Sequence, residues 1–189
     1  MRILLLAPLS LCAALWLAPL WTAGAQAQTA AAPVQRESAV KAAFLYKFGA
    51  FVEWPAGVFQ RPDSPFVIGV AGDEAVAADL EQLVAGRTLE GRPLVVRRVT
   101  ADPVSSAGLH VLFVAYRGDR LREVLAATTG PVLVVTDQDR GLRMGSVINF
   151  SSEGGRVRFS VSLVAAEARS LRLSARLLAV AQDVEGRAR

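Results

Sequence analysis

The chain has 189 residues, of which 52% are hydrophobic and 20% charged, and its formal net charge is +4 at pH 7. This length suits one domain with an adequate core, and the charge is too small to indicate a nucleic-acid-binding protein. With one cysteine and one histidine in the whole sequence, a disulfide framework, thiol chemistry and a zinc site are not expected.

Residues 1–27 have the pattern of a secretory signal peptide. Arg2 supplies a positive charge, residues 3–22 carry no charged side chain, and small residues follow around Ala25 and Ala27. This is the order of a cleavable signal, with cleavage after Ala25 or Ala27. The alternative is a retained membrane anchor, because the apolar stretch approaches the about 20 residues that a spanning helix needs. Two prolines interrupt the stretch, so we expect cleavage and export to the periplasm.

The predicted export also determines whether the mature protein contains a cysteine. Cys12 is the only one and leaves with the signal, so the mature protein has neither a thiol nor a disulfide in an oxidising compartment. Behind the signal we expect a flexible leader over residues 28–37, one folded domain over residues 38–183 and a frayed tail over residues 184–189.

The first predicted helix begins with Ser38 as its N-cap and ends before Pro55, because the residue that precedes a proline avoids helical geometry. Its apolar residues recur at steps of three and four, and they are Val40, Phe44, Leu45, Phe48, Phe51 and Val52. This spacing predicts an amphipathic helix that is unusually rich in aromatic side chains.

Two strand-helix-strand units follow. The first has a strand over residues 66–70, a helix capped by Asp73 and a strand over residues 93–99. The second has a strand over residues 109–114, a helix capped by Asp119 and a strand over residues 132–135. Such units predict a largely parallel sheet with helices on its faces.

The last third of the chain predicts antiparallel pairing. Strands over residues 146–150 and 156–161 are separated by a Glu-Gly-Gly turn at 153–155, and the second strand alternates apolar with polar residues. A short helix over residues 164–168, an extended segment over 171–173 and a final helix capped by Ser174 complete the chain. The predicted fold class is α/β: a single domain with a mostly parallel mixed β-sheet flanked by helices and an antiparallel C-terminal hairpin.

Few residues offer catalytic or ligand-binding chemistry. His110 stands second in an apolar strand, which favours a partly buried structural histidine over a catalytic one. Asp137 and Asp139 follow the strand 132–135, where carboxylates can bind a ligand or a hard cation, but capping of the turn at 140–143 is the simpler interpretation. Neither phosphate-loop pattern is present. We therefore expect no catalytic site, no cofactor and no metal.

The binding candidates lie at the end of the first helix and near the C-terminus. Phe51 and Trp54 belong to the aromatic helix, where most rings are expected in the core but some could contact a partner or a planar ligand. Arg172 stands between two leucines, two residues before the cap Ser174 of the last helix, and an exposed strand arginine is the alternative. The candidate partner- or ligand-binding residues are thus Phe51, Trp54, Arg172 and Ser174.

Whole stretches of the sequence resemble the YfiR family of exported proteins. They are VKAAFLYKFGAFVEWP (40–55), FVIGVAGD (66–73), GRPLVVRRV (91–99), LHVLFV (109–114), VLVVTD (132–137), INFSSEGGRVRFSVSLVAA (148–166) and LRLSARLLAVA (171–181). The resemblance implies a periplasmic, non-enzymatic repressor that binds the periplasmic sensor domain of an inner-membrane diguanylate cyclase or another membrane sensor. It further implies release by an outer-membrane lipoprotein, lowered cyclic di-GMP, less biofilm and a homodimer. No nucleic acid is expected as a partner, because the net charge is small and exported proteins rarely meet nucleic acid.

The sequence departs from that family at two places. Leu109 stands where members often have a disulfide-forming cysteine, so the redox dependence seen with such cysteines is not expected here. Gly145 and Ser146 stand where a pair of glycines is common. A small-molecule binding or sensing module remains the alternative function, and an enzyme using His110, Asp137 or Asp139 is the third hypothesis.

Overall fold

The computed structural model describes residues 36–100 and 106–186, which belong to one compact unit. The predicted signal peptide, residues 28–35 of the predicted leader and residues 187–189 of the predicted tail lie outside the described residues. The first helix begins at Glu37, one residue before the predicted start of the domain.

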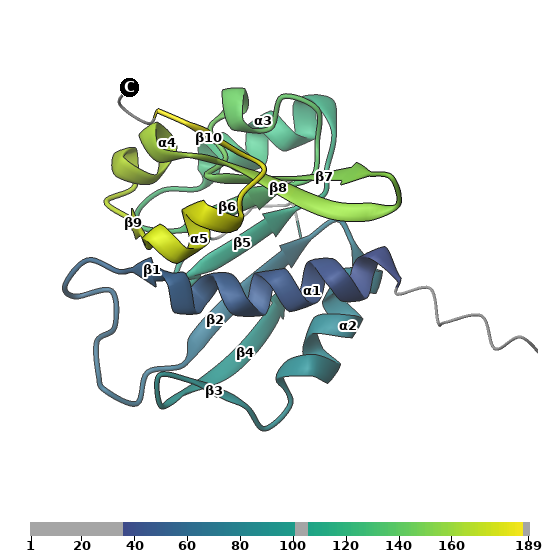
Figure 1. The fold of residues 1–189 in the computed structure, drawn as a ribbon. Helices are drawn as coiled ribbons and strands as arrows, with labels where there is room; N and C mark the ends of the chain where they lie inside the picture. Colours follow the sequence, from purple (N-terminus) through teal and green to yellow (C-terminus); the bar gives the residue numbers. More distant parts are fainter. Residues whose placement is uncertain (1–35, 101–105, 187–189) are drawn as a thin grey trace, which may run out of the picture. The chain divides into compact units, whose positions relative to one another are not determined.

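The centre of the fold is an eight-stranded sheet with the strand order β10-β8-β7-β6-β5-β2-β4-β3 (Figure 1). Its strands are β2 (Phe66–Ala71), β3 (Thr88–Leu89), β4 (Arg92–Arg98), β5 (Val111–Val114), β6 (Leu133–Thr136), β7 (Ile148–Glu153), β8 (Arg156–Ser162) and β10 (Asp183–Glu185). Neighbours pair in parallel except at β7–β8 and β3–β4. The predicted mostly parallel sheet with an antiparallel C-terminal hairpin is therefore confirmed.

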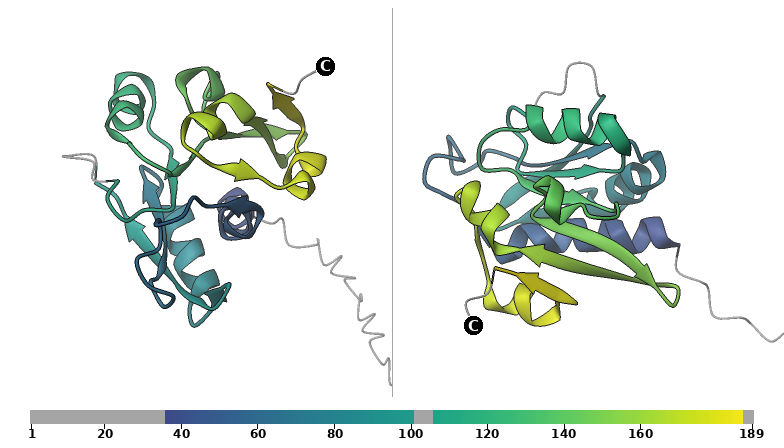
Figure 2. Two further views of the ribbon diagram at one scale, coloured as in Figure 1. Left: turned by 90° about the vertical axis from the view of Figure 1, so that its left-hand side faces the viewer. Right: turned by 90° about the horizontal axis from the view of Figure 1, so that it is seen from above.

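Helices cover both faces of this sheet. They are α1 (Glu37–Phe48), α2 (Glu74–Val84), α3 (Gly118–Ala127), α4 (Leu163–Ala168) and α5 (Ala175–Val180), with the 3₁₀ turns η1 (Gly49–Phe51) and η2 (Leu142–Met144). Figure 2 shows α1 and α2 on one side of the sheet and α3 on the other. Because both faces are covered, every residue of β2, β5 and β6 is buried.

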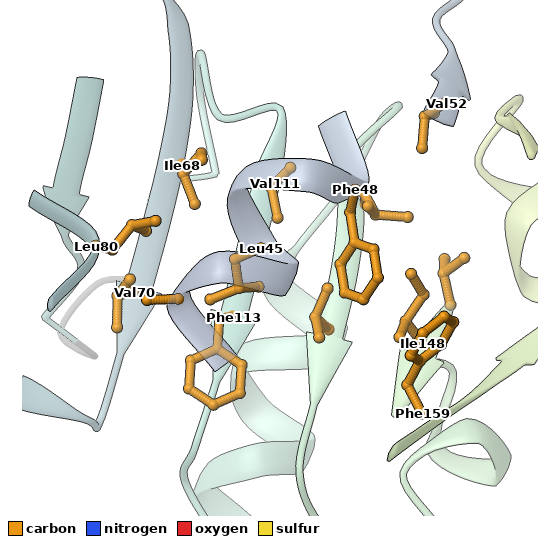
Figure 3. Close-up of a cluster of buried hydrophobic side chains, with 14 of the residues drawn as sticks. Leu45, Phe48, Val52, Ile68, Val70, Leu80, Val111, Phe113, Ile148 and Phe159 are labelled. Atoms are coloured by element: carbon orange, nitrogen blue, oxygen red, sulfur yellow. The ribbon is translucent and has the colours of Figure 1, made fainter. Parts of the chain in front are cut away.

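Two hydrophobic cores result from this arrangement. In the larger one, Leu45 and Phe48 of α1 and Leu80 of α2 pack against the sheet, where they meet residues such as Ile68 and Phe113 (Figure 3). The smaller one lies under α3 and contains Leu121, Val124 and Leu125 together with residues of β2, β5 and β6. Burial of this apolar surface is the main contribution to the stability of the fold.

The hairpin owes its register to two glycines. Gly154 and Gly155 join β7 to β8 with φ angles of 56° and 73°, which is the left-handed geometry that a two-residue hairpin turn of type I′ requires. The strands then pair from Glu153 with Arg156 to Ile148 with Val161. The turn predicted from the Glu-Gly-Gly sequence is confirmed.

The first helix differs from the prediction at both ends. Ser38 is not its N-cap: the helix is preceded by Arg36, and the Ser38 hydroxyl donates to Asp79 Oδ2 at 2.6 Å. The helix ends at Phe48, so its predicted continuation to Trp54 is wrong. The apolar residues beyond Phe48 follow the helical spacing although they are not helical, because Phe51 and its neighbours also pack against the larger core. Their backbone is instead set by η1 and by β1 (Val52–Glu53), which pairs with β9 (Arg172–Leu173).

Two other local predictions are wrong for the same kind of reason. Asp119 does not cap α3: Arg117 precedes the helix, and Asp119 lies in its first turn with an ion pair to Arg122. Val184 and Glu185 do not belong to a frayed tail, because they pair in β10 with Val161 and Ser162. A strand of three residues that depends on a distant partner leaves no local signal.

Candidate functional site

The pairing of β1 with β9 joins the two halves of the predicted binding site. Val52 lies opposite Leu173 and Glu53 opposite Arg172 in this antiparallel pair. The backbone N–H of Ser174 donates to the carbonyl of Phe51 at 2.9 Å. Residues that are far apart in the chain therefore form one surface; we call Phe51, Trp54, Arg172 and Ser174, with the strands that hold them, the β1–β9 surface.

The two aromatic side chains of this surface are anchored in the core. Phe51 and Trp54 are both half-buried and pack against the larger hydrophobic core. The indole of Trp54 makes edge-to-face contacts with Phe66 and His110, with centroid separations of 5.6 and 5.8 Å. The rings are thus held rigidly, and only part of each faces solvent.

Among the four residues of the β1–β9 surface, only Arg172 is exposed, and Ser174 is half-buried like the two aromatic residues. Arg172 is exposed, and no ion pair is recorded for it with the residues that the structure describes. The hydroxyl of Ser174 accepts the N–H of Leu177 at 3.3 Å, so Ser174 caps α5 as predicted. A free guanidinium next to a rigid indole can bind a carboxylate or stack on a planar group.

Three hollows meet at Pro55, beside Trp54. One of about 450 Å³ lies between Trp54, Glu167 and Arg172. A second of about 630 Å³ extends along the loop before β5 and past His110. A third of about 560 Å³ reaches Arg169. The β1–β9 surface is therefore part of a larger uneven surface, which suits a protein partner as well as a small ligand.

Sequence reasoning missed Arg169, which closes α4 and lines the third hollow. Its guanidinium donates to the carbonyl of Thr128 at 3.2 Å, and burial lowers its pKa below the ordinary arginine value. Nothing in its neighbourhood along the chain distinguishes it from the other arginines. Its position depends on the approach of α4 to the end of α3, which only the fold reveals.

His110 is a structural residue in this fold. Its Nδ1 accepts a hydrogen bond from the N–H of Val67 at 3.1 Å. The imidazole is buried and stacked against Phe59 and Phe66, with centroid separations of 4.5 and 5.0 Å. Burial, together with the nearby charge of Arg92, lowers the pKa of His110 to about 4. The imidazole is therefore neutral at neutral pH and engaged with the backbone, as expected of a core histidine.

The two aspartates do not cap the turn that follows β6. Asp137 Oδ2 forms an ion pair with Lys41 Nζ at 2.8 Å, and Asp139 is exposed. Gly141 precedes η2, and no side chain caps it. The expected capping role is wrong because Lys41, on a distant helix, reaches the Asp137 carboxylate first.

Within residues 36–100 and 106–186, no three His, Cys, Asp or Glu side chains lie close enough to hold a metal ion. No helix in these ranges is long and apolar enough to cross a membrane.

The fold and the sequence comparisons together identify the fold class and the family of this protein. Its sheet, covered by helices on both faces, makes it an α/β domain of the doubly covered class. The chain belongs to the YfiR/HmsC-like family, because the model of that family matches residues 38–182. Members of this family are periplasmic regulators of diguanylate cyclases. No curated protein matches the chain. The family resemblance noted in the sequence is confirmed.

Proposed function

We propose that this protein is exported to the periplasm, binds the periplasmic sensor domain of an inner-membrane diguanylate cyclase and represses that enzyme. The family supports regulation of a cyclase as the general role. Lower cyclase output lowers cyclic di-GMP and with it biofilm formation. The proposal includes cleavage of residues 1–27, an outer-membrane lipoprotein that competes for the repressor, and a homodimer. The protein itself is not an enzyme in this scheme.

The β1–β9 surface is our candidate for the contact with the sensor domain. The observation that carries the choice is the pairing of Glu53 with Arg172, which brings the exposed arginine beside Trp54 and Pro55 around one hollow. Arginine and tryptophan are the residue types that contribute most often to binding energy at protein interfaces. Anchoring of the indole in the core reduces the entropy that its binding would cost.

A charge reversal at Arg172 tests this proposal. We expect Arg172→Glu to weaken binding of the purified sensor domain by about 30-fold or more, since central interface arginines contribute about 2 kcal/mol or more. The measurement is a titration of the sensor domain by calorimetry. In cells that lack the gene, cyclic di-GMP and surface attachment should rise. Expression of the Arg172→Glu protein should not lower them to the normal level.

Arg156→Glu is the matched control, because Arg156 is also exposed but lies at the tip of the hairpin. It should bind and complement as the unchanged protein does. Deletion of the gene without any change in cyclic di-GMP under several growth conditions would contradict the proposed function. Equal weakening by both substitutions would contradict the choice of surface.

A small-molecule sensing module is the second candidate. The hollow of about 450 Å³ between Trp54 and Arg172 favours it, because an indole edge and a guanidinium can pack on a planar ligand. The carboxylates of Glu53 and Glu167, which also line the hollow, can accept hydrogen bonds from that ligand. A thermal-shift screen of periplasmic metabolites should then show stabilisation that Arg172→Glu removes. No stabilisation by any compound would count against it. A ligand bound there could also change the affinity for the partner, so the two functions are compatible.

A further inference from the structure

The strand β4 has an incompletely paired outer edge. On its inner side it pairs with β2 from Leu94 to Arg98. On its outer side, β3 reaches only Arg92 and Pro93, and the N–H of Leu94 donates to Arg87 at 3.3 Å. We call residues 94–98 the β4 edge.

The direction of the backbone groups on the β4 edge follows from one hydrogen bond. The N–H of Val99 donates to Val70 of β2 at 2.8 Å, so the odd-numbered residues of β4 turn their backbone groups inward. Because these directions alternate along a strand, those of Val96 and Arg98 point outward. No described residue is recorded as a backbone partner for them on that side. Two outward N–H and two outward C=O groups thus offer the pattern to which another strand can pair.

One face of the β4 edge is open as well. Val95 and Arg97 point to the side of the sheet on which α3 lies, but the core under α3 contains no residue of β4. Figure 2 shows β4 and β3 extending past α3. Val95 is consequently 41% exposed, one of the few large apolar side chains of the described chain that are. Arg97 is exposed, and its guanidinium donates to the carbonyl of Ala107 at 2.9 Å.

Charge indicates what kind of strand fits there. Arg98 lies on the face that α2 covers, where it pairs with both Glu74 and Glu81. In contrast, Arg97 donates to a carbonyl, and Arg92 donates to carbonyls and stacks on an aromatic ring. Neither has a recorded ion pair with a described carboxylate. On the face of Val95, Arg97 is therefore a cation without a counter-charge among the described residues, and a carboxylate of a partner would supply it.

A second copy of the chain fits this edge poorly. Antiparallel pairing of two β4 edges through Val96 would set Val95 of each copy opposite Arg97 of the other. The two Arg97 side chains would then be diagonal neighbours on the same face, within about 7–8 Å, where like charges are unfavourable. The same face offers an apolar contact at Val95 and an anion contact at Arg97 to a strand of different composition.

We propose that the β4 edge binds an extended acidic segment of a partner protein by β-strand addition. In this mode the backbone groups of Val96 and Arg98 provide the hydrogen bonds, and the alternate side chains provide selectivity. The segment places an apolar residue beside Val95 and a carboxylate beside Arg97. This site lies outside the β1–β9 surface and does not depend on the function proposed above.

A designed peptide tests the site on the intact mature protein. The probe is acetyl-Thr-Glu-Thr-Val-Thr-Glu-Thr-amide, which places its valine beside Val95 and one glutamate beside Arg97 in either strand direction. The residues at its other end stay unpaired, because β3 occupies the outer side of Arg92 and Pro93. We expect chemical-shift changes at Val95–Arg98 in ¹⁵N-labelled protein and slower hydrogen exchange at the amides of Val96 and Arg98. The peptide with lysine in place of both glutamates is the matched control and should bind about fivefold more weakly or less.

Two variants separate strand addition from non-specific attraction. Arg97→Glu should reverse the preference, so that the lysine peptide binds better than the glutamate peptide. Val96→Pro removes an outward N–H without touching the ladder to β2, a position where an edge strand tolerates proline, and it should abolish the protection of Arg98. Circular dichroism and thermal unfolding establish that this variant is folded, and Arg97→Glu remains informative if it is not.

Three results would overturn the proposal. The first is the absence of shift changes at Val95–Arg98 at saturating peptide. The second is binding that is confined to the β1–β9 surface. The third is protection of Val96 and Arg98 that appears without peptide and rises with protein concentration, which would identify a second copy as the occupant. If the protein binds the peptide at the β4 edge but does not repress a cyclase, only the function proposed earlier is contradicted.

Discussion

Burial of His110 makes one residue of this fold sensitive to acid. The buried imidazole has a pKa of about 4 in the folded protein, below the ordinary value of 6.5 that the unfolded chain has. The unfolded state therefore binds the proton more readily between these two values. As the pH falls from about 6.5 to about 4, the free energy of unfolding should drop by up to about 3 kcal/mol because of this residue. Above pH 6.5 it should make no difference.

The measurement is simple because His110 is the only histidine in the chain. Its single imidazole signal can be followed by proton NMR, and a midpoint near 6.5 would contradict the prediction. Urea unfolding at several pH values should show a smaller loss of stability in His110→Gln than in the unchanged protein. The comparison removes the background from carboxylates, which titrate in both proteins.

At the scale of single residues, local sequence predicted caps only where the cap has no competitor. Asp73 and Ser174 cap their helices as predicted, since their side chains form no competing hydrogen bond or ion pair with another described side chain. Ser38 is not a cap because its hydroxyl donates a hydrogen bond to Asp79. Asp137 is not a cap because its carboxylate pairs with Lys41. These partners are distant in the sequence, so the pattern around each residue carries no information about them.

At the scale of elements, the pair Lys41–Asp137 ties α1 to the end of β6. The two side chains are only 10% and 14% exposed, and Lys41 also pairs with Glu37 at 2.9 Å. Burial alone would lower the pKa of Lys41, but hydrogen bonds to Asp137 and Glu37 outweigh it and raise the pKa above the ordinary value. The ammonium group is thus charged and closely held between a helix and the sheet.

Lys41→Met should destabilise the protein by about 2 kcal/mol, because it leaves the Asp137 carboxylate nearly buried without its cation. Lys47→Met, on the exposed side of the same helix, is the control and should change stability by less than about 0.5 kcal/mol. Both are measured by urea unfolding. In Lys41→Met with Asp137→Leu, part of the loss should be recovered. Strict additivity of the two single changes would show that the pair is not coupled.

The elements that sequence predicted well are those with their own period or turn. Strand-helix-strand units and a Gly-Gly hairpin leave strong local patterns, and their order predicted the sheet. The short strands β1, β3, β9 and β10 were not recognised as paired strands. Each has two or three residues, too few for a period, and each exists because of the strand beside it. The candidate site was predicted as four residues, but its assembly by β1 and β9 was not.

At the scale of the whole molecule, two hydrophobic cores on either side of one sheet hold the fold together. Residues 28–189 contain no cysteine, so reduction has no covalent bond to break. Thermal unfolding of residues 28–189 should therefore have the same midpoint, within about 1 °C, with and without excess dithiothreitol, since no disulfide contributes to stability. Binding to the proposed partner, a cyclase sensor domain, should be equally insensitive to reduction. A midpoint that falls on reduction would contradict this prediction.

The pairing of β1 with β9 has a consequence for the order in which the protein becomes competent. Val52 and Leu173 meet across most of the folded chain, so closing this contact requires a long loop to be ordered first. In the proposed export from the N-terminus, Trp54 would emerge early, but Arg172 would join it only when nearly the whole domain has emerged. The β1–β9 surface thus forms only in the completely folded domain. A truncated or half-folded chain lacks it and cannot bind a partner that contacts both strands.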